Sequence, residues 1–317
     1  RAYEKIHSSI LKTPLISNET INNITKAKVY FKLENLQYTG SFKMRGASNK
    51  ILQLSNEEKL RGIVAYSSGN HAQAVAFASK LHDIQATIVM PNNAPLLKIN
   101  NTKKYGAKIV LYDAKSENRE NIAFEIASRE NKTIVKPYDD LDIIAGQGTA
   151  GKEIAEELLE KKIKPHLYLC CCGGGGLIAG TSTYLKHVFP DINNFAVEPK
   201  EFNDTQLSLQ NNTIMKNEKS AQTICDALLA IQPGEITFSI NKNTLSGGLS
   251  VSDLEVKKTI IELAENMNIV VEPGGAVAAT ALLTNKIDVK NKNVVVMISG
   301  GNIDYELFSS IVSTIRQ

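Results

Sequence analysis

The chain has 317 residues, of which 43% are hydrophobic and 22% are charged, and its formal net charge is +3. This profile is typical of a globular protein of about two domains. The small net charge, without a clustered basic stripe, argues against a nucleic-acid partner. No apolar run is long enough to span a bilayer, so we expect no membrane partner either.

The four cysteines are Cys170, Cys171, Cys172 and Cys225. Three adjacent cysteines are poor material for a disulfide framework and lack the spacing of zinc ligands. We interpret them as small buried hydrophobic residues in a strand. Few and unpaired cysteines favour a reducing compartment, and we expect a cytoplasmic protein.

Short apolar, β-branched segments alternate with helical patterns along most of the chain, which predicts βαβ units and a parallel sheet. Strands are expected at 28–33, 63–66, 86–90, 108–112, 133–135, 166–171, 195–198, 269–272 and 293–298. Helices are expected at 1–12, 43–54, 117–130, 147–160, 177–188 and 252–267, with others ending near 81 and 105. Residues 53–139 are expected to form a small mobile domain inserted into a larger one, made of 1–52 and 140–317.

The turn Gly173-Gly174-Gly175-Gly176 lies between an expected strand and an expected helix. Glycine lets backbone N–H groups approach an anion closely, and the N-terminus of the next helix adds positive partial charge. Four flexible residues in a row oppose folding entropically, so an ordinary loop would rarely carry them. The turn predicts an anion site, although it does not match the dinucleotide fingerprint.

A second glycine pattern, at 146–152, matches the spacing of a nucleotide-binding phosphate loop. Glu153 occupies the position at which that loop needs a hydroxyl to hold magnesium, and the residues before the pattern make a poor strand. We interpret the match as a coincidence at the start of a helix. Nucleotide hydrolysis is therefore a disfavoured alternative.

The stretch Ser67-Ser68-Gly69-Asn70-His71 lies at another strand-to-helix turn. Its hydroxyls, amide and backbone N–H groups at a helix N-terminus suit a carboxylate. Serine and asparagine are also ordinary helix caps, so these residues alone leave the two interpretations evenly weighted. His71 by itself is more typical of a hydrogen-bonded structural histidine than of a catalytic base.

Lys43 precedes a helix start rich in small residues. A lysine at such a place is usually solvated, but a buried and partly neutral lysine can form a Schiff base with a carbonyl cofactor. Ser299 follows the last expected strand, at the edge where open α/β sheets bind ligands, or is a simple turn residue. Glu198 and Asp204 offer oxygen ligands for a hard cation, or are two solvated carboxylates.

Taken together, these motifs resemble the fold-type II pyridoxal-phosphate enzymes, and within them the serine/threonine dehydratase and serine racemase group. The matching stretches are 41–47, 67–71, 145–149, 173–176 and 299–302, in the family's order over nearly the whole chain. The resemblance implies a two-domain α/β fold like that of the tryptophan synthase β subunit. Each domain would be an open, mostly parallel sheet flanked by helices, and the protein would be a homodimer.

The resemblance also implies a role for each motif. Lys43 would carry pyridoxal 5′-phosphate as an internal aldimine, and Phe42 would pack on one face of its ring. Asn70 would hydrogen-bond the phenolic oxygen, and Ser299 the pyridine nitrogen, which a serine leaves largely unprotonated. The phosphate would be held by Gly173, Gly174, Gly175 and Gly176.

The reaction implied is a β-elimination that converts a hydroxy amino acid such as L-serine or L-threonine into a 2-keto acid and ammonia. The substrate carboxylate would bind to Ser67, Ser68, Gly69, Asn70 and His71, and Lys43 would remove the α-proton. Ser68 would lie on the opposite ring face and could return a proton, so a serine racemase with dehydratase side activity is an alternative. A non-catalytic amino-acid binder is a further one.

Two further sites follow from the resemblance. Glu198 and Asp204, with the carbonyl of Phe202, match the family's site for a divalent cation such as Mg²⁺, Ca²⁺ or Mn²⁺. Arg119 matches an arginine near the substrate in some members, where it could favour a second carboxylate, as in 3-hydroxyaspartate. It is equally compatible with a surface position on a helix. The three adjacent cysteines depart from the family pattern; they could alter the substrate pocket but are expected to leave the cofactor contacts unchanged.

Overall fold

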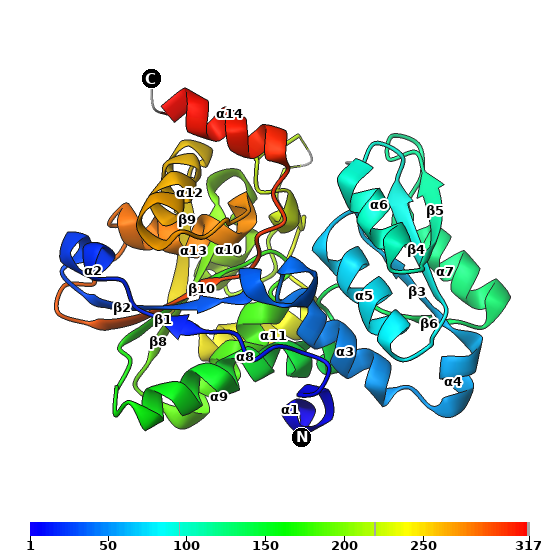
Figure 1. Cartoon of the computed structure of the whole chain (residues 1–317), viewed down its shortest axis with the longest axis horizontal. Helices are drawn as coiled ribbons and strands as arrows, with labels where there is room; N and C mark the ends of the chain where they lie inside the picture. The colour runs from blue at the N-terminus through cyan, green and yellow to red at the C-terminus, as the bar shows by residue number, and fades with distance from the viewer. Residues whose placement is uncertain (95, 219, 316–317) are drawn as a thin grey trace.

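The computed structural model describes residues 1–94, 96–218 and 220–315, which form two sheets flanked by helices (Figure 1). The larger sheet has the strand order β1-β2-β10-β7-β8-β9, and every pair except β1–β2 is parallel. Its strands are β1 (Leu15–Ile16), β2 (Lys28–Leu33), β7 (Leu167–Cys171), β8 (Asn193–Pro199), β9 (Gly247–Val251) and β10 (Asn293–Ile298). The predicted α/β architecture is confirmed.

The smaller sheet has the order β5-β4-β3-β6 and is parallel throughout. Its strands are β3 (Ile63–Tyr66), β4 (Ala86–Pro91), β5 (Lys108–Tyr112) and β6 (Thr133–Ile134). The central strand β3 is buried along its whole length, as expected for a short apolar run covered on both faces. Around it lie α4 (Asn56–Arg61), α5 (Asn70–Leu81), α6 (Leu96–Lys104) and α7 (Arg119–Glu130).

The helices of the larger half cover both faces of the six-stranded sheet (Figure 1). They are α1 (Ala2–Ile6), α2 (Glu19–Thr25), α3 (Lys43–Gln53), α8 (Leu141–Glu160), α9 (Gly176–Val188), α10 (Asp204–Asn211), α11 (Glu235–Thr244), α12 (Asp253–Met267), α13 (Pro273–Leu283) and α14 (Tyr305–Ile315). Short 3₁₀ turns are η1 (Glu34–Leu36), η2 (Tyr38–Gly40), η3 (Lys200–Phe202) and η4 (Asp226–Leu228). Helix α13 is buried from its first residue to Leu282, in keeping with its apolar sequence on all sides.

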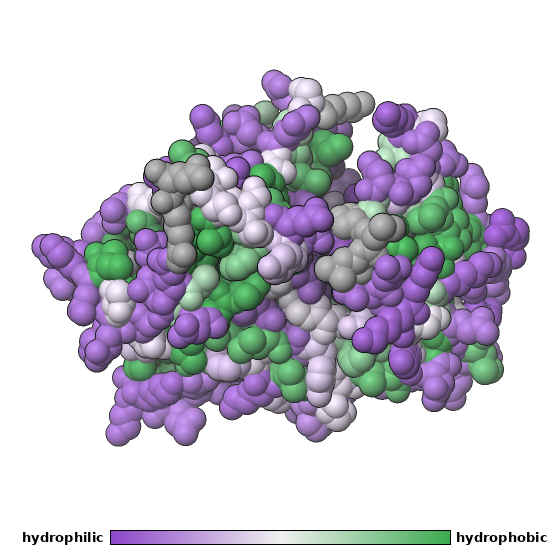
Figure 2. Space-filling view, turned by 45° about the horizontal axis from the view of Figure 1, so that its top comes forward, coloured by the Kyte–Doolittle hydropathy of each residue, from purple (hydrophilic) through white to green (hydrophobic). Residues whose placement is uncertain are grey.

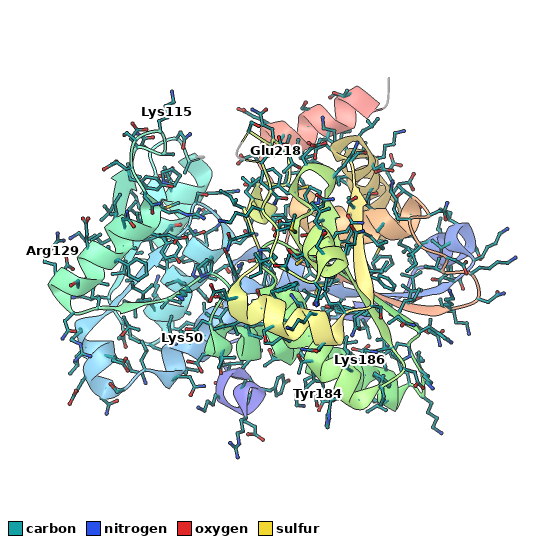
Figure 3. The ribbon with its side chains drawn as sticks, turned by 180° about the vertical axis from the view of Figure 1, so that it is seen from behind. Lys50, Lys115, Arg129, Tyr184, Lys186 and Glu218 are labelled. Atoms are coloured by element: carbon teal, nitrogen blue, oxygen red, sulfur yellow. The ribbon has the colours of Figure 1, made fainter. Side chains whose placement is uncertain are left out.

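Helix α3 lies between the two sheets (Figure 1). Its apolar residues Met44, Ala47 and Ile51 pack in the same cluster as the residues of β3 and β4. On its polar side, Lys50 pairs with Asp140 at 2.8 Å, at the N-terminus of α8 (Figure 3). The division into domains at residues 53–139 stays a proposal; the four-stranded sheet lies within that range.

Several expected elements differ from the observed ones. The helix expected at 1–12 ends at Ile6, and residues 269–272 form no strand. The helix expected at 147 begins at Leu141, because the side chain of Asp140 accepts hydrogen bonds from the first-turn N–H groups of Asp142 and Ile143. The glycine pattern at 146–152 therefore lies inside a helix and is not a phosphate loop.

Four charged side chains form a fully buried network behind α3. Arg45 donates to both oxygens of Glu34 at 2.7 Å and to those of Glu153 at 2.9 and 2.8 Å. Lys32 donates to Glu153 at 2.6 Å, and none of the four side chains is exposed. Two positive and two negative charges cancel, and the network ties the first turn of α3, which carries Lys43, to β2, η1 and α8.

The outer surface is mixed in character. Apolar patches lie among hydrophilic side chains (Figure 2), and charged residues such as Lys115, Arg129 and Lys186 occur on both halves (Figure 3). Within the described residues, no helix combines the length and the apolar character that crossing a bilayer requires.

Candidate active site

One pocket collects residues from the carboxyl ends of β3, β7 and β10, where open parallel sheets bind ligands. The residues expected at the site that line it are Phe42, Lys43, Ser67, Ser68, Gly69, Asn70, His71, Arg119, Gly173, Gly174, Gly175, Gly176 and Ser299. The structure thus brings together segments that are more than 200 positions apart, as between Asn70 and Glu272. Glu198, Phe202 and Asp204 lie outside this pocket.

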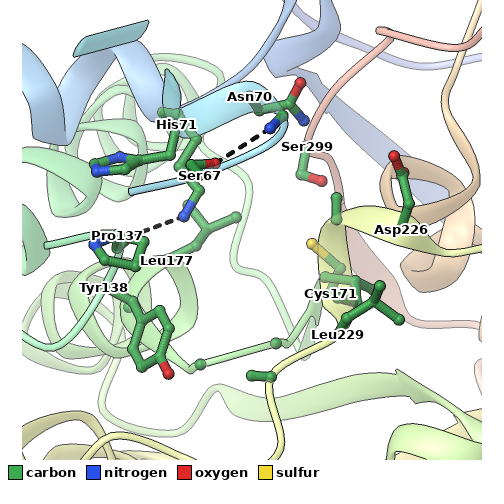
Figure 4. Close-up of a pocket in the computed structure, with 18 of the residues that line it drawn as sticks. Ser67, Asn70, His71, Pro137, Tyr138, Cys171, Leu177, Asp226, Leu229 and Ser299 are labelled. Atoms are coloured by element: carbon green, nitrogen blue, oxygen red, sulfur yellow. Dashed lines mark hydrogen bonds between the residues drawn. The ribbon is translucent and has the colours of Figure 1, made fainter. Parts of the chain in front are cut away.

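Lys43 is the first residue of α3 and points into the pocket. Its Nζ donates a hydrogen bond to the carbonyl oxygen of Pro137 at 2.8 Å (Figure 4). Removal of the ammonium group from water lowers the pKa of Lys43 to about 8, although Cys171 and Glu272 act in the opposite direction. A substantial fraction of this amine is therefore neutral near physiological pH, as a Schiff-base lysine requires.

The turn at 67–71 leads into α5. Ser67 Oγ accepts a hydrogen bond from the N–H of Gly69 at 3.2 Å (Figure 4). The capping position of α5 is Gly69, and no side chain among the described residues caps this helix, so ordinary N-capping does not account for the serines. The first-turn N–H groups remain available to an anion in the pocket.

His71 is buried and makes a hydrogen bond through Nε2 to the carbonyl of Val135 at 3.0 Å. Burial, together with the nearby positive charge of Lys43, lowers the pKa of His71 to about 3. The ring is therefore neutral, and Nε2 must carry the proton because a carbonyl only accepts. This is the hydrogen-bonded histidine that the sequence favours.

The glycine turn has two physical reasons for its composition. A Cβ at Gly174 would lie 2.3 Å from ring atoms of Tyr138, and one at Gly175, where φ is +89°, would lie 2.8 Å from Asn241 Nδ2. Packing alone thus excludes larger residues. In the described part of the chain, the N–H groups of 173–176 also have no protein acceptor, and they precede the N-terminus of α9. They suit a phosphate.

Ser299 follows β10 and is 5% exposed. It lies next to Cys171 at the end of β7 (Figure 4), and hydrogen bonding by Cys170 and Ser299 lowers the pKa of the Cys171 thiol, as does the charge of Lys43. The sequence indicates that the cysteines could alter the substrate pocket, and Cys171 and Cys172 do line the pocket. All four cysteines are free and buried, as expected.

The sequence missed several pocket residues. Lys98 of α6 forms an ion pair with Asp226 of η4, and so connects the two halves. Glu272 accepts a hydrogen bond from Asn70 at 2.5 Å; burial, chiefly, and the charge of Asp226 raise its pKa to about 8. An acidic residue before a small-residue helix was visible at 272, but nothing local indicated that it faces Asn70. Tyr138 gave no signal at all.

Arg119 begins α7 and is exposed at the pocket's edge. Its guanidinium lies 5.8 Å from the centre of the Tyr66 ring, within the range of a cation–π contact. In the part of the chain that the structure describes, no carboxylate pairs with it. A residue of the four-stranded half thus offers an unneutralised positive charge to the pocket.

The two carboxylates of the expected cation site are close together and buried. Glu198 accepts hydrogen bonds from the N–H groups of Thr205 and Gln206 at 2.9 and 2.7 Å. Asp204 Oδ1 accepts from Asn217, whereas its buried Oδ2 has no partner within the described residues. Burial raises the pKa of both groups, and in Glu198 the charge of Asp204 adds to the effect.

Comparison with known proteins agrees with this geometry. The family model "Pyridoxal-phosphate dependent enzyme" matches residues 6–300. The chain is 38% identical to L-threo-3-hydroxyaspartate ammonia-lyase of Saccharomyces cerevisiae over 98% of its own length and 94% of that protein. It is 42% identical to a catabolic L-threonine dehydratase of Staphylococcus aureus over 98% and 90%.

A solved structure gives the same result. Serine racemase from Dictyostelium discoideum superposes with a TM-score of 0.89 at 39% identity, covering 96% of each chain. The fold match extends over nearly the whole chain, and the family model covers every segment that lines the pocket. The chain belongs to the family of pyridoxal-phosphate dependent enzymes.

Proposed function

We propose that the protein is a lyase that eliminates water from a β-hydroxy amino acid such as L-serine or L-threonine. Hydrolysis of the eliminated product then takes up one water and releases ammonia and a 2-keto acid. The observation that carries this proposal is the position of Lys43, a half-buried amine with a pKa of about 8 between the glycine turn and the 67–71 turn. Relatives that include an L-threonine dehydratase and a hydroxyaspartate ammonia-lyase support it.

The pocket residues fit pyridoxal phosphate, because the 173–176 turn offers N–H groups that have no acceptor among the described residues and Lys43 offers an amine. Asn70 and Ser299 would hydrogen-bond the ring's polar atoms, and Phe42 would pack on its face. The cofactor supplies an electron sink for the bond broken at the α-carbon. Lys43 would bind the cofactor, then take the α-proton once a substrate amine replaces it.

The remaining residues bind and orient the substrate. The turn formed by Ser67, Ser68, Gly69, Asn70 and His71 would hold the α-carboxylate with hydroxyl and N–H donors. His71 is neutral and already donates to Val135, so it would orient the turn instead of acting as a base. These contacts would keep the α-hydrogen facing Lys43.

Serine racemisation is the second candidate, because Ser68 also lines the pocket and a serine racemase is among the structural relatives. Ser68 would return a proton to the opposite face of the α-carbon.

One experiment separates the lyase from the racemase. Purified protein is supplied with L-serine, L-threonine or L-threo-3-hydroxyaspartate, and both keto acid and D-amino acid are measured. Keto acid from none of the three would refute the lyase proposal. In Lys43→Ala, we expect the visible cofactor band and all activity to be absent.

Arg119 supports a substrate with a second carboxylate, since it is unneutralised and is held by the Tyr66 ring. In Arg119→Gln, kcat/KM for 3-hydroxyaspartate should fall by about 10–100-fold, while that for serine changes little. Equal losses of kcat/KM for 3-hydroxyaspartate and serine would show that Arg119 does not recognise the second carboxylate. Tyr66→Phe, which keeps the ring, is the matched control.

A divalent cation at Glu198, Asp204 and the carbonyl of Phe202 is part of the proposal. The unpartnered Oδ2 of Asp204 and the raised pKa of both carboxyl groups support it, and oxygen ligands suit Mg²⁺ or Ca²⁺. In the described ranges, no three or more acidic, histidine or cysteine side chains are grouped so that they could hold a metal ion, so the carbonyl and water must supply the other ligands. A homodimer in the cytoplasm is also proposed; the free thiols favour this compartment.

A further inference from the structure

Asn70 is held by two side chains that have no part in the mechanism above. Its Oδ1 accepts a hydrogen bond from Asn302 Nδ2 at 2.7 Å, and its Nδ2 donates one to Glu272 Oε1 at 2.5 Å. Asn70 opens α5 in the four-stranded half, whereas Glu272 precedes α13 and Asn302 follows β10 in the other half. The two contacts therefore join the halves at the wall of the pocket.

A main-chain carbonyl sets the direction of this hydrogen-bond chain. Asn302 Nδ2 also donates to the carbonyl oxygen of Thr39 at 2.7 Å. A carbonyl can only accept, so Asn302 must present its nitrogen there, and its second N–H then faces Asn70. Asn70 must therefore accept this hydrogen bond through its side-chain oxygen, so its side-chain nitrogen faces Glu272.

Two glycines leave space for the hydrogen-bonded side chains of Glu272 and Asn302. A Cβ at Gly300 would lie 2.0 Å from Glu272 Oε1, and one at Gly40 would lie 2.5 Å from Asn302 Oδ1. Gly40 precedes the turn that carries Lys43, and Gly300 follows Ser299. The side chains of Glu272 and Asn302 are thus closely enclosed by the backbone of the loops that form the pocket. They have little space in which to rotate.

Glu272 can accept from Asn70 in either protonation state, since a carboxylate and the carbonyl oxygen of a carboxyl group are both acceptors. It is 1% exposed, and burial and the charge of Asp226 raise its pKa to about 8, opposed by Lys98. The charge of Cys171 acts on the pKa of Glu272 in the same direction as that of Asp226. The orientation of Asn70 is therefore expected to hold across the physiological pH range.

One N–H of Asn70 remains after these contacts, and in the described part of the chain it has no protein acceptor. We propose that Glu272 and Asn302 are positioning residues, which fix the amide of Asn70 so that this N–H donates to the cofactor. An Asn70 turned the other way would present its oxygen and repel an anionic oxygen of the cofactor. The inference rests on the proposed contact of Asn70 with the cofactor, and not on which amino acid reacts.

The test uses Asn302→Asp and reads the bound cofactor without substrate. An aspartate cannot donate to Thr39 or to Asn70, so the amide of Asn70 should turn over. We expect the dissociation constant of the cofactor to rise by about tenfold or more and its visible band to shift, because the phenolic oxygen loses its donor. The matched control is Asn35→Asp. Asn35 is half-buried outside the pocket and donates to the carbonyl of Val270 at 3.2 Å, and its variant should keep affinity and band.

Two further variants address Glu272. Glu272→Met removes the acceptor at similar length and should shift the band in the same direction as Asn302→Asp. Glu272→Gln keeps the shape of the side chain and an acceptor oxygen. This variant should fold and retain the wild-type visible band. A shifted band in Glu272→Gln would contradict the proposal. Lowered melting temperatures with wild-type spectra in Asn302→Asp and Glu272→Met would assign a merely structural role and overturn it. Absence of the band from the wild-type protein would instead refute cofactor binding itself.

Discussion

Arg45 and Glu153 form a two-point ion pair, with nitrogen–oxygen distances of 2.9 and 2.8 Å, in which neither side chain is exposed. Glu34 and Lys32 complete a neutral network behind the helix that carries Lys43. A buried charge without its partner is strongly destabilising, because the low-dielectric surroundings give it no substitute for water.

The first prediction concerns this network. Arg45→Met leaves Glu34 and Glu153 with one cation between them and should lower the free energy of unfolding by about 3–5 kcal/mol. Urea unfolding of the cofactor-free protein measures the change. Lys161→Met, which breaks an exposed pair with Glu157 on α8, is the control and should stay within about 0.5 kcal/mol. Similar values for the two variants would contradict a structural role for the network.

The second prediction concerns the pH dependence of cofactor attachment. Only the neutral amine of Lys43 attacks the cofactor's aldehyde, and its pKa is about 8 instead of the ordinary 10.5. Below pH 8 the rate should therefore rise roughly tenfold per pH unit, and it should level off above 8. Growth of the visible band after mixing cofactor with cofactor-free protein gives the rate. A rate that keeps rising to pH 10 would mean that Lys43 is solvated like a surface lysine.

The third prediction separates packing from anion binding in the glycine turn. Gly174→Ala places a Cβ 2.3 Å from the Tyr138 ring and should destabilise the protein by about 1–3 kcal/mol. Tyr138→Ala removes the obstacle, so the double variant should recover much of that loss. A double-mutant cycle on unfolding free energies tests the coupling. Strict additivity would show that the ring is not what excludes a side chain at 174.

The fourth prediction concerns the proposed cation. Burial raises the pKa of Asp204 from 3.8 to about 7. Without a cation, its contribution to stability is fully present below pH 3.8 and is lost as pH rises through about 7, since the folded state holds its proton more tightly. Mg²⁺ or Ca²⁺ restores the deprotonated form, so the rise in melting temperature on adding cation should be larger at pH 8 than at pH 6.

The control for this prediction compares two aspartates. Asp204→Asn should abolish the response to cation, whereas Asp191→Asn, at an exposed site paired with Lys164, should keep it. Melting curves with chelator set the baseline. A cation response that survives in Asp204→Asn would locate the ion elsewhere.

Much of the fold was predictable because its signals are local. The strands β3, β4, β7 and β10 are short apolar runs, and such runs read as buried parallel strands wherever they occur. The elements that the sequence missed or misplaced are of two kinds. Strand β9 is glycine-rich and half-buried and so lacks this signal, whereas the segment 269–272 is an apolar run that carries the signal but forms no strand.

The residues of the candidate site also fall into those that local sequence motifs predict and those that only the folded structure reveals. Motifs with unusual composition, such as the four glycines, the 67–71 turn and the lysine at 43, could be singled out from the sequence. Glu272, Tyr138, Lys98 and Asp226 are single residues without a pattern, and only folding shows which of them reach the pocket.

The sequence by itself determined the composition of the strands, the turns that follow them and the family to which the motifs belong. These are properties of contiguous residues, which set local conformation through periodicity, glycine and helix caps. The tertiary structure alone decided which polar groups meet: Glu153 with Arg45, Tyr138 with the glycine turn, and Asn70 with Glu272 and Asn302. Hydrogen bonds and ion pairs act over a few ångströms, so partners far apart in the sequence are fixed only when the sheets and helices have packed.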